Sequence, residues 1–190
     1  MRRFAFRRTY APACLILALA SVAMLAASAS AVTGGASVPP PPGEGATPRL
    51  TTSLPKAQLS PDGRVAIAPE SAPLEVQKAI WAANRITNKP YRYGGGHRRF
   101  RDSGYDCSGA VSYALRGGKL LKRPLHSRAF MRWGDKGRGD WITVFTNPGH
   151  AYVVIAGLRF DTSGPGERGP RWRKGARSSR SYTARHPEGF

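Results

Sequence analysis

Residues 150–163 constrain the fold more than any other stretch, because they contain two strand-like segments around a very short turn. They read HAYVVI-AG-LRFDTS, with apolar and polar positions alternating on both sides of Ala-Gly. This alternation around a two-residue loop predicts an antiparallel β-hairpin. In that register Ile155 faces Leu158 and Val153 faces Phe160, which gives the hairpin one apolar face.

The opposite face of this hairpin is expected to carry two functional side chains. His150 and Asp161 fall there as diagonal cross-strand neighbours, within reach of a side-chain hydrogen bond. A carboxylate that orients an imidazole makes the imidazole a better base. We therefore expect His150 to accept a proton and Asp161 to hold the imidazole ring in place. A three-residue loop would separate the pair. The alternative for His150 is a half-buried strand histidine, and the alternative for Asp161 is a polar residue near a hairpin end.

A helix and a further strand surround the hairpin. Apolar residues recur at helical spacing after Pro73, which suits a first helical turn, and the residue before Pro90 disfavours helix. Residues 139–145 predict another strand. The sequence therefore predicts an α+β domain with a second, cysteine-bearing helix packed on an antiparallel sheet. The periodic apolar positions are Val76, Ala79, Ile80, Ala83 and Ile86.

The chain has two cysteines, and only Cys107 lies in the expected domain. If the segment that contains Cys14 is removed, Cys107 has no internal disulfide partner. Asp106 is a good N-cap for a helix over residues 110–115, which places the thiol in the first turn. There the helix dipole favours a negative charge and lowers a thiol pKa. The alternative is an inert buried cysteine.

The N-terminal part predicts export. Residues 1–31 combine an arginine-rich start, an alanine-rich apolar run and small residues at plausible cleavage sites, which is typical of a signal peptide. A retained membrane anchor is the alternative; after cleavage no membrane span is expected. Residues 32–70 are rich in Pro, Gly and Ser and predict a disordered linker, with a possible short strand at 63–68. The domain is expected at 71–190, with a basic C-terminal tail.

The formal net charge of +19 indicates a polyanionic partner. Four of these charges belong to arginines in the segment that export would remove. Outside the cell the anionic polymers of an envelope are the expected partner, and nucleic acid is not expected. A surface that only maintains solubility is the alternative.

Four motifs together resemble the NlpC/p-sixty family of bacterial cell-wall cysteine peptidases. They are PYRYGG at 90–95, YDCSG at 105–109, GDWI at 139–142, and His150 at the start of a strand. The resemblance implies a papain-like fold. It also implies Cys107 as nucleophile, His150 as base and Asp161 as the third polar residue, with a substrate subsite formed by Tyr91, Asp106 and Ser108.

The resemblance further implies a secreted, wall-associated monomer that hydrolyses an amide bond in peptidoglycan stem peptides. The family most often cuts between D-glutamate and diaminopimelate, and some members are amidases or acyltransferases; no metal or cofactor is implied. Two other functions stay open: a non-catalytic envelope-binding protein that holds anionic wall polymers, and an extracellular nucleic-acid binder.

Overall fold

The computed structural model describes residues 53–166 and 169–190. The expected signal peptide at 1–31 and the first part of the expected linker, 32–52, lie outside the described residues. The helices are α1 (Leu74–Asn84), α2 (Cys107–Gly117) and α3 (Ser127–Phe130). The strands are β1 (Gln58–Leu59), β2 (Ala66–Ile67), β3 (Asp135–Lys136), β4 (Ile142–Asn147), β5 (His150–Ile155), β6 (Leu158–Asp161), β7 (Arg171–Arg173) and β8 (Thr183–His186).

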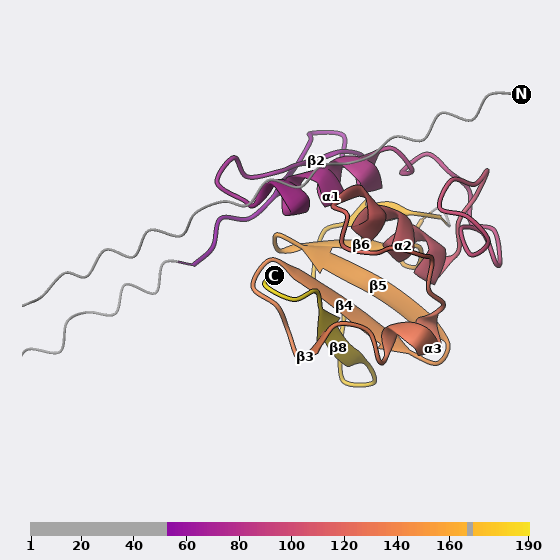
Figure 1. Ribbon diagram of the computed structural model, residues 1–190. Coiled ribbons are helices and arrows are strands. Elements are labelled where there is room, and N and C mark those ends of the chain that lie inside the picture. The colour runs from indigo at the N-terminus through magenta and orange to yellow at the C-terminus, as the bar shows by residue number, and fades with distance from the viewer. Residues whose placement is uncertain (1–52, 167–168) are drawn as a thin grey trace, which may run out of the picture. The chain divides into compact units, whose positions relative to one another are not determined.

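The central element is a sheet in the order β3-β8-β4-β5-β6-β7, in which every neighbouring pair is antiparallel. Helices α1 and α2 cover one face of this sheet, and α3 lies near the end of β4 (Figure 1). A separate two-stranded sheet of β1 and β2 lies beside α1. The described part therefore combines helices with an antiparallel sheet, as predicted.

The β5–β6 hairpin has the predicted register. Val153 pairs with Phe160 and Ile155 with Leu158 across a two-residue turn. Ala156 and Gly157 have φ values of 46° and 80°, and positive φ at both central residues matches the right-handed twist of the flanking strands. The turn places the ends of β5 and β6 in a fixed relation, on which the site depends.

The core lies between the helices and the sheet. The periodic apolar residues of the α1 segment are all at most 2% exposed, which confirms the predicted buried face. Helix α2 packs closely against α1, since a Cβ added to Gly117 would lie 2.3 Å from the Cβ of Ala82. Burying these side chains and the inner residues of β4 and β5 supplies the main stabilisation of the fold.

The expected disordered linker extends too far along the chain. Residues 53–70 belong to the domain: Ala57 and Ala66 are buried, and the Ala57 N–H donates to the Ala156 carbonyl at 2.8 Å. The side chain of Asn84 also bonds both backbone groups of Ala66, each at 2.9 Å. A segment poor in large apolar residues is ordered here because the domain satisfies its backbone groups.

The expected basic C-terminal tail is also part of the sheet. Strand β7 pairs with β6, and β8 inserts between β3 and β4. Trp172 of β7 is 5% exposed and packs against Phe160 with ring centroids 4.9 Å apart. The arginines in these short segments hide their strand character in the sequence. Pairing with the other strands of the sheet stabilises them.

Strand β4 begins three residues later than predicted and continues to Asn147. The backbone N–H groups of Trp141 and Ile142 both donate to the Phe190 carbonyl, and Gly139 lies against that same carbonyl. Phe190 thus occupies the position in which the partner strand of a longer β4 would lie. Among residues 53–166 and 169–190, no helix is long and apolar enough to cross a membrane.

Replacing Trp172 with Ala should strongly destabilise the domain if β7 belongs to its core. The variant loses the contact with Phe160 and the hydrogen bond from the indole N–H to Asn84, 2.7 Å long. We expect the free energy of unfolding to fall by about 3–5 kcal/mol in denaturant titrations. Trp81, 45% exposed, provides the matched control. Equal, small effects for both variants would contradict this placement of β7.

Candidate active site

Helix α2 starts at Cys107 because Asp106 caps it. The Asp106 carboxylate accepts a hydrogen bond from the Gly109 backbone N–H at 2.8 Å, while the Asp106 backbone is extended. This cap satisfies one of the amide groups that have no acceptor in the first turn. Cys107 is therefore held where the positive end of the helix dipole favours a thiolate.

The glycine-rich loop supports this helix start by close backbone contact. The Asp106 backbone N–H donates to the Gly95 carbonyl at 3.2 Å. A Cβ on Gly109 would lie only 1.9 Å from that carbonyl oxygen, so no larger residue fits without a shift. Gly95 and Gly109 thus allow the loop to pack closely against α2.

His150 and Asp161 lie together at one end of the β5–β6 hairpin. The His150 Nε2 is 2.9 Å from the Asp161 Oδ1, and the side chain of Asp161 is fully buried. A carboxylate can only accept, so Nε2 carries the hydrogen of this bond. The remaining ring nitrogen, Nδ1, is then available to the Cys107 thiol.

Cys107 and His150 shift each other's protonation. Burial raises the pKa of the Cys107 thiol, but a hydrogen bond from His150, the Ala151 backbone N–H and the imidazole charge lower it overall. Burial lowers the pKa of His150, but its hydrogen bonds to Asp161 and Cys107 and their negative charges raise it to about 9. Both directions favour a thiolate beside an imidazolium.

Asp161 is held by more groups than the hairpin predicts. Its Oδ1 also accepts from the Ser163 backbone N–H at 2.9 Å, and its Oδ2 lies 3.0 Å from a guanidinium nitrogen of Arg177. The same Arg177 nitrogen donates to the Ser163 hydroxyl. Although burial raises the pKa of Asp161, these bonds and charges together with His150 lower it overall, so the carboxylate stays ionised.

Arg177 and Ser127 also lie at this site, and neither was predicted from the sequence. Arg177 lies in the loop between β7 and β8, within the segment expected to be a tail. Ser127 begins the four-residue α3, and its hydroxyl is 3.7 Å from the Cys107 sulfur. The Ser127 carbonyl in turn accepts from the Thr146 hydroxyl at 2.7 Å. Neither residue has a local pattern that distinguishes it, since their roles come from contacts across the fold.

Of the three residues expected to form a subsite, one is exposed and two are buried. Tyr91 is 41% exposed, whereas Asp106 and Ser108 are 4% and 2% exposed. His97 joins the two buried residues, with its Nε2 2.9 Å from the Asp106 Oδ2 and 3.0 Å from the Ser108 Oγ. His97 is the most exposed member of this network, with 32% of its side chain accessible.

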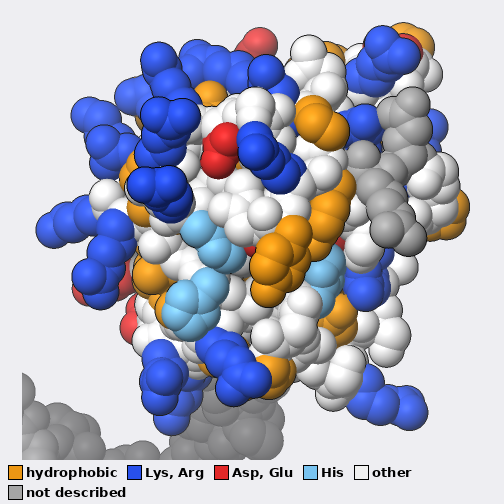
Figure 2. Space-filling model, turned by 90° about the vertical axis from the view of Figure 1, so that its right-hand side faces the viewer, with side chains coloured by type: hydrophobic (Ala, Val, Ile, Leu, Met, Phe, Trp, Pro, Cys, Tyr) orange, Lys and Arg blue, Asp and Glu red, His pale blue; other side chains and the backbone are white. Residues whose placement is uncertain are grey.

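A cavity of about 380 Å³ opens at the histidine, and Tyr91 lines it together with His150, Ser163 and Gly164. Figure 2 shows one face of the molecule, on which histidine and hydrophobic side chains gather in the middle and Lys and Arg side chains surround them. Within the described ranges, no group of His, Cys, Asp and Glu side chains is arranged to hold a metal ion.

Cys107, His150 and Asp161, predicted from separate parts of the sequence, thus lie in one chain of contacts. Such an arrangement can perform nucleophilic attack by a thiolate and proton transfer by an imidazole.

Comparison with known proteins adds a partial likeness to solved structures. No family model and no curated protein matches the chain. Among solved structures, the peptidoglycan hydrolase RipB from Mycobacterium tuberculosis is similar at 20% sequence identity and a TM-score of 0.46. The likeness covers 67% of this chain and 72% of RipB. A likeness at this level does not by itself indicate a shared activity.

Replacing His150 with Ala should raise the pKa of the Cys107 thiol. Burial of the thiol remains in the variant, whereas the hydrogen bond and the positive charge that oppose it are lost. The thiolate absorbance, followed through a pH titration, should appear only at or above the ordinary pKa of about 8.5. His186→Ala is the matched control and should titrate like the wild type. An unchanged thiol pKa in His150→Ala would contradict the pairing.

Replacing Asp161 with Asn should lower the pKa of His150 from about 9 toward the ordinary value of 6.5. The neutral amide removes the negative charge that stabilises the imidazolium, although it can still bond the ring. The histidine ring signals in an NMR pH titration report this pKa directly. Asp135→Asn, an exposed change in β3, is the control. A His150 pKa that stays near 9 would show that Asp161 does not set it.

Proposed function

We propose that this protein is a cysteine hydrolase that cleaves an amide bond through a Cys107–His150–Asp161 triad. The observation that supports it is the chain of contacts from the Cys107 thiol through His150 to the buried Asp161, with pKa shifts that favour thiolate and imidazolium. A purely structural cysteine needs neither an adjacent imidazole nor a buried carboxylate that orients it.

In the proposed reaction the Cys107 thiolate attacks the amide carbonyl carbon, and the carbonyl oxygen becomes an oxyanion. Backbone N–H groups in the first turn of α2 would stabilise this negative charge. His150 donates its Nδ1 proton to the leaving amine as the C–N bond breaks, which leaves a thioester on Cys107.

Hydrolysis reverses the role of the imidazole. Neutral His150 accepts a proton from water while the water oxygen attacks the thioester carbonyl, and the thiolate leaves as the acid forms. Asp161 keeps the hydrogen on Nε2 throughout, so that Nδ1 always faces the reacting atoms. Because Arg177 and Ser163 hold Asp161 in place, the ring has little freedom to turn away.

We propose peptidoglycan stem peptides as the substrate, with the bond between D-glutamate and diaminopimelate as the expected cleavage point. This rests on the resemblance to the NlpC/p-sixty family, whose papain-like fold agrees with a cysteine at a helix start beside an antiparallel sheet. Tyr91 and the His97–Asp106–Ser108 network would form the subsite for the acyl side. Export and association with the wall are part of the same proposal.

A non-catalytic envelope-binding protein is the second candidate, and the excess of arginine supports it. It does not explain the contact between a thiol and an imidazole. The two candidates differ in a simple outcome: a binding protein should hold walls in a salt-sensitive way and release no fragments.

Digestion of purified peptidoglycan tests the proposed function. The protein should release stem-peptide fragments that mass spectrometry identifies, and Cys107→Ala should release at least about a thousand times less product. Cys107→Ser is the matched variant that preserves the shape of the site. Release of the same fragments by wild type and Cys107→Ala would sink the proposal, and so would wall binding without any release.

The rate should depend on pH at both ends of a window. Below the lowered pKa of Cys107 the thiolate is protonated and the rate falls. Above about pH 9 the imidazolium of His150 loses the proton that the leaving amine needs. A profile of kcat/KM against pH should therefore be bell-shaped, and a rate that keeps rising past the pKa of His150 would contradict its role as acid.

A further inference from the structure

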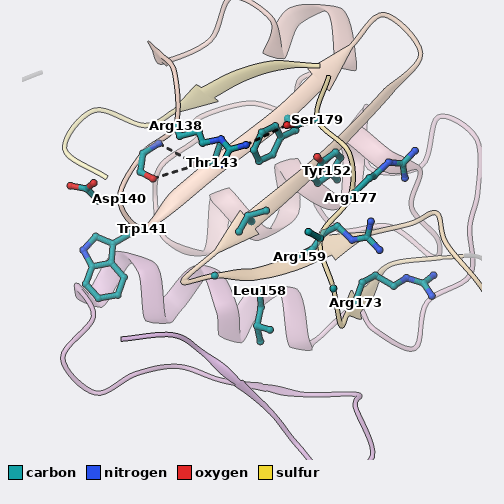
Figure 3. Close-up of a pocket in the computed structure, with 16 residues that line it drawn as sticks. Arg138, Asp140, Trp141, Thr143, Tyr152, Leu158, Arg159, Arg173, Arg177 and Ser179 are labelled. Carbon is teal, nitrogen blue, oxygen red and sulfur yellow. Dashed lines mark hydrogen bonds between the residues drawn. The ribbon is translucent and has the colours of Figure 1, made fainter. Parts of the chain in front are cut away.

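A second cavity lies on the face of the sheet opposite the helices; it shares Arg177 with the proposed active site, but Cys107 and His150 do not line it. It has a volume of about 400 Å³, within the range of small-molecule sites. Strands β4, β5 and β6 form its floor, and the loop that follows β7 covers one side. Figure 3 shows this cavity with its lining side chains.

The cavity has one strongly positive end. Arg159, Arg173 and Arg177 extend side by side at that end, whereas Asp140 and Trp141 lie at the opposite end (Figure 3). Asp140, the only carboxylate among the described lining residues, is thus far from these three arginines. An anion that enters would be drawn to the arginine end.

Two of these arginines, Arg159 and Arg177, share one carboxylate, that of Asp161. The side chain of Arg159 is 12% exposed, its guanidinium stays 3.8 Å from the Asp161 Oδ2, and its Nε has no hydrogen-bond partner among the described residues. Arg177 uses the same Oδ2, and the other oxygen of Asp161 holds His150. One carboxylate therefore serves two guanidinium groups and an imidazole.

Neighbouring charges also act on Arg173. Burial lowers the pKa of Arg173, and repulsion from Arg159 and Arg171 opposes the favourable effect of Asp161. Guanidinium groups bind phosphate and carboxylate through paired hydrogen bonds, which makes such oxyanions the best match.

The remaining lining fits the body of a sugar better than a bare ion. Phe145 and Tyr152 stack on each other in the floor with ring centroids 5.0 Å apart and are almost fully buried, whereas Trp141 stands partly exposed at the far end. Arg138 lies over the Phe145 ring at 5.4 Å and donates to Ser179. The partly exposed ring of Trp141, with hydrogen-bonding groups nearby, suits a pyranose ring, whose C–H faces are apolar and whose edges are polar.

We propose that this arginine cavity binds a saccharide that carries a phosphate or carboxylate group, with the anionic group at Arg159 and Arg177 and the sugar body toward Trp141. The site is separate from Cys107 and does not depend on hydrolysis. An anionic glycan carries such groups. The cavity would therefore give the protein a glycan-binding site in addition to the site for its proposed peptide substrate.

An NMR titration of the purified protein tests this assignment. The ligands are N-acetylglucosamine 1-phosphate, glucuronic acid, uncharged N-acetylglucosamine and inorganic phosphate. We expect the two anionic sugars to shift the arginine Nε–H and Trp141 indole signals with a dissociation constant of roughly 0.1–1 mM, as is typical of ligands of this size. Comparison of these two ligands distinguishes a phosphate from a carboxylate as the preferred group.

Matched variants localise the binding. Arg177→Gln should weaken binding of the anionic sugar by about tenfold or more, because it removes a charge-assisted hydrogen bond. Arg180→Gln removes the same charge from an exposed position of the same loop that does not line the cavity, and it should leave the affinity unchanged. Exposed Arg138 gives a second lining variant, Arg138→Gln, that does not touch Asp161.

Three results would overturn the proposal: no shifts with either anionic sugar, equal losses in Arg177→Gln and Arg180→Gln, or inorganic phosphate binding as tightly as the sugar phosphate. The last result would remove the saccharide from the assignment. Cys107→Ala should bind as the wild type does, so a failure of the proposed hydrolysis and a failure of this site can be told apart.

Discussion

The carboxylate of Asp161 is the interaction on which the rest of the site depends. It is completely buried, and one oxygen holds the ring of His150 while the other holds the guanidinium of Arg177. An ionised group without water is tolerated only because both oxygens have strong donors. Asp161 therefore connects the proposed active site, through His150, with the arginine cavity, through Arg177.

Because of this connection, the geometry of the site on β5 and β6 depends on strands β7 and β8. Arg177 reaches Asp161 only because β7 and β8 anchor both ends of its loop in the sheet. Arg177 also lies over the rings of Tyr152 and Tyr182, each about 5.6 Å from its guanidinium carbon. Arg177 thus contacts both Asp161, which holds His150, and Tyr152 in the cavity floor. The two proposed sites are therefore physically adjacent.

Local pattern predicted a large part of the fold and the central pair of the site. Alternation and a two-residue turn were sufficient to set the register of β5 and β6, and that register alone brings His150 to Asp161. Helical spacing predicted the buried face of α1, and a good N-cap at Asp106 predicted the start of α2. These features depend on neighbours within a few residues, which a sequence displays directly.

Long-range packing decided the rest. The order of residues 53–70, the strands at 171–173 and 183–186, and the contact of Ser127 with Cys107 all join parts of the chain that carry no local sign of one another. Arginine-rich strands and a four-residue helix are stable only when the core and the sheet edge supply partners. The sequence by itself determined a thiol at a helix start and a histidine facing an acid; the tertiary structure decided that Arg177 holds that acid, because only folding brings residue 177 to residue 161.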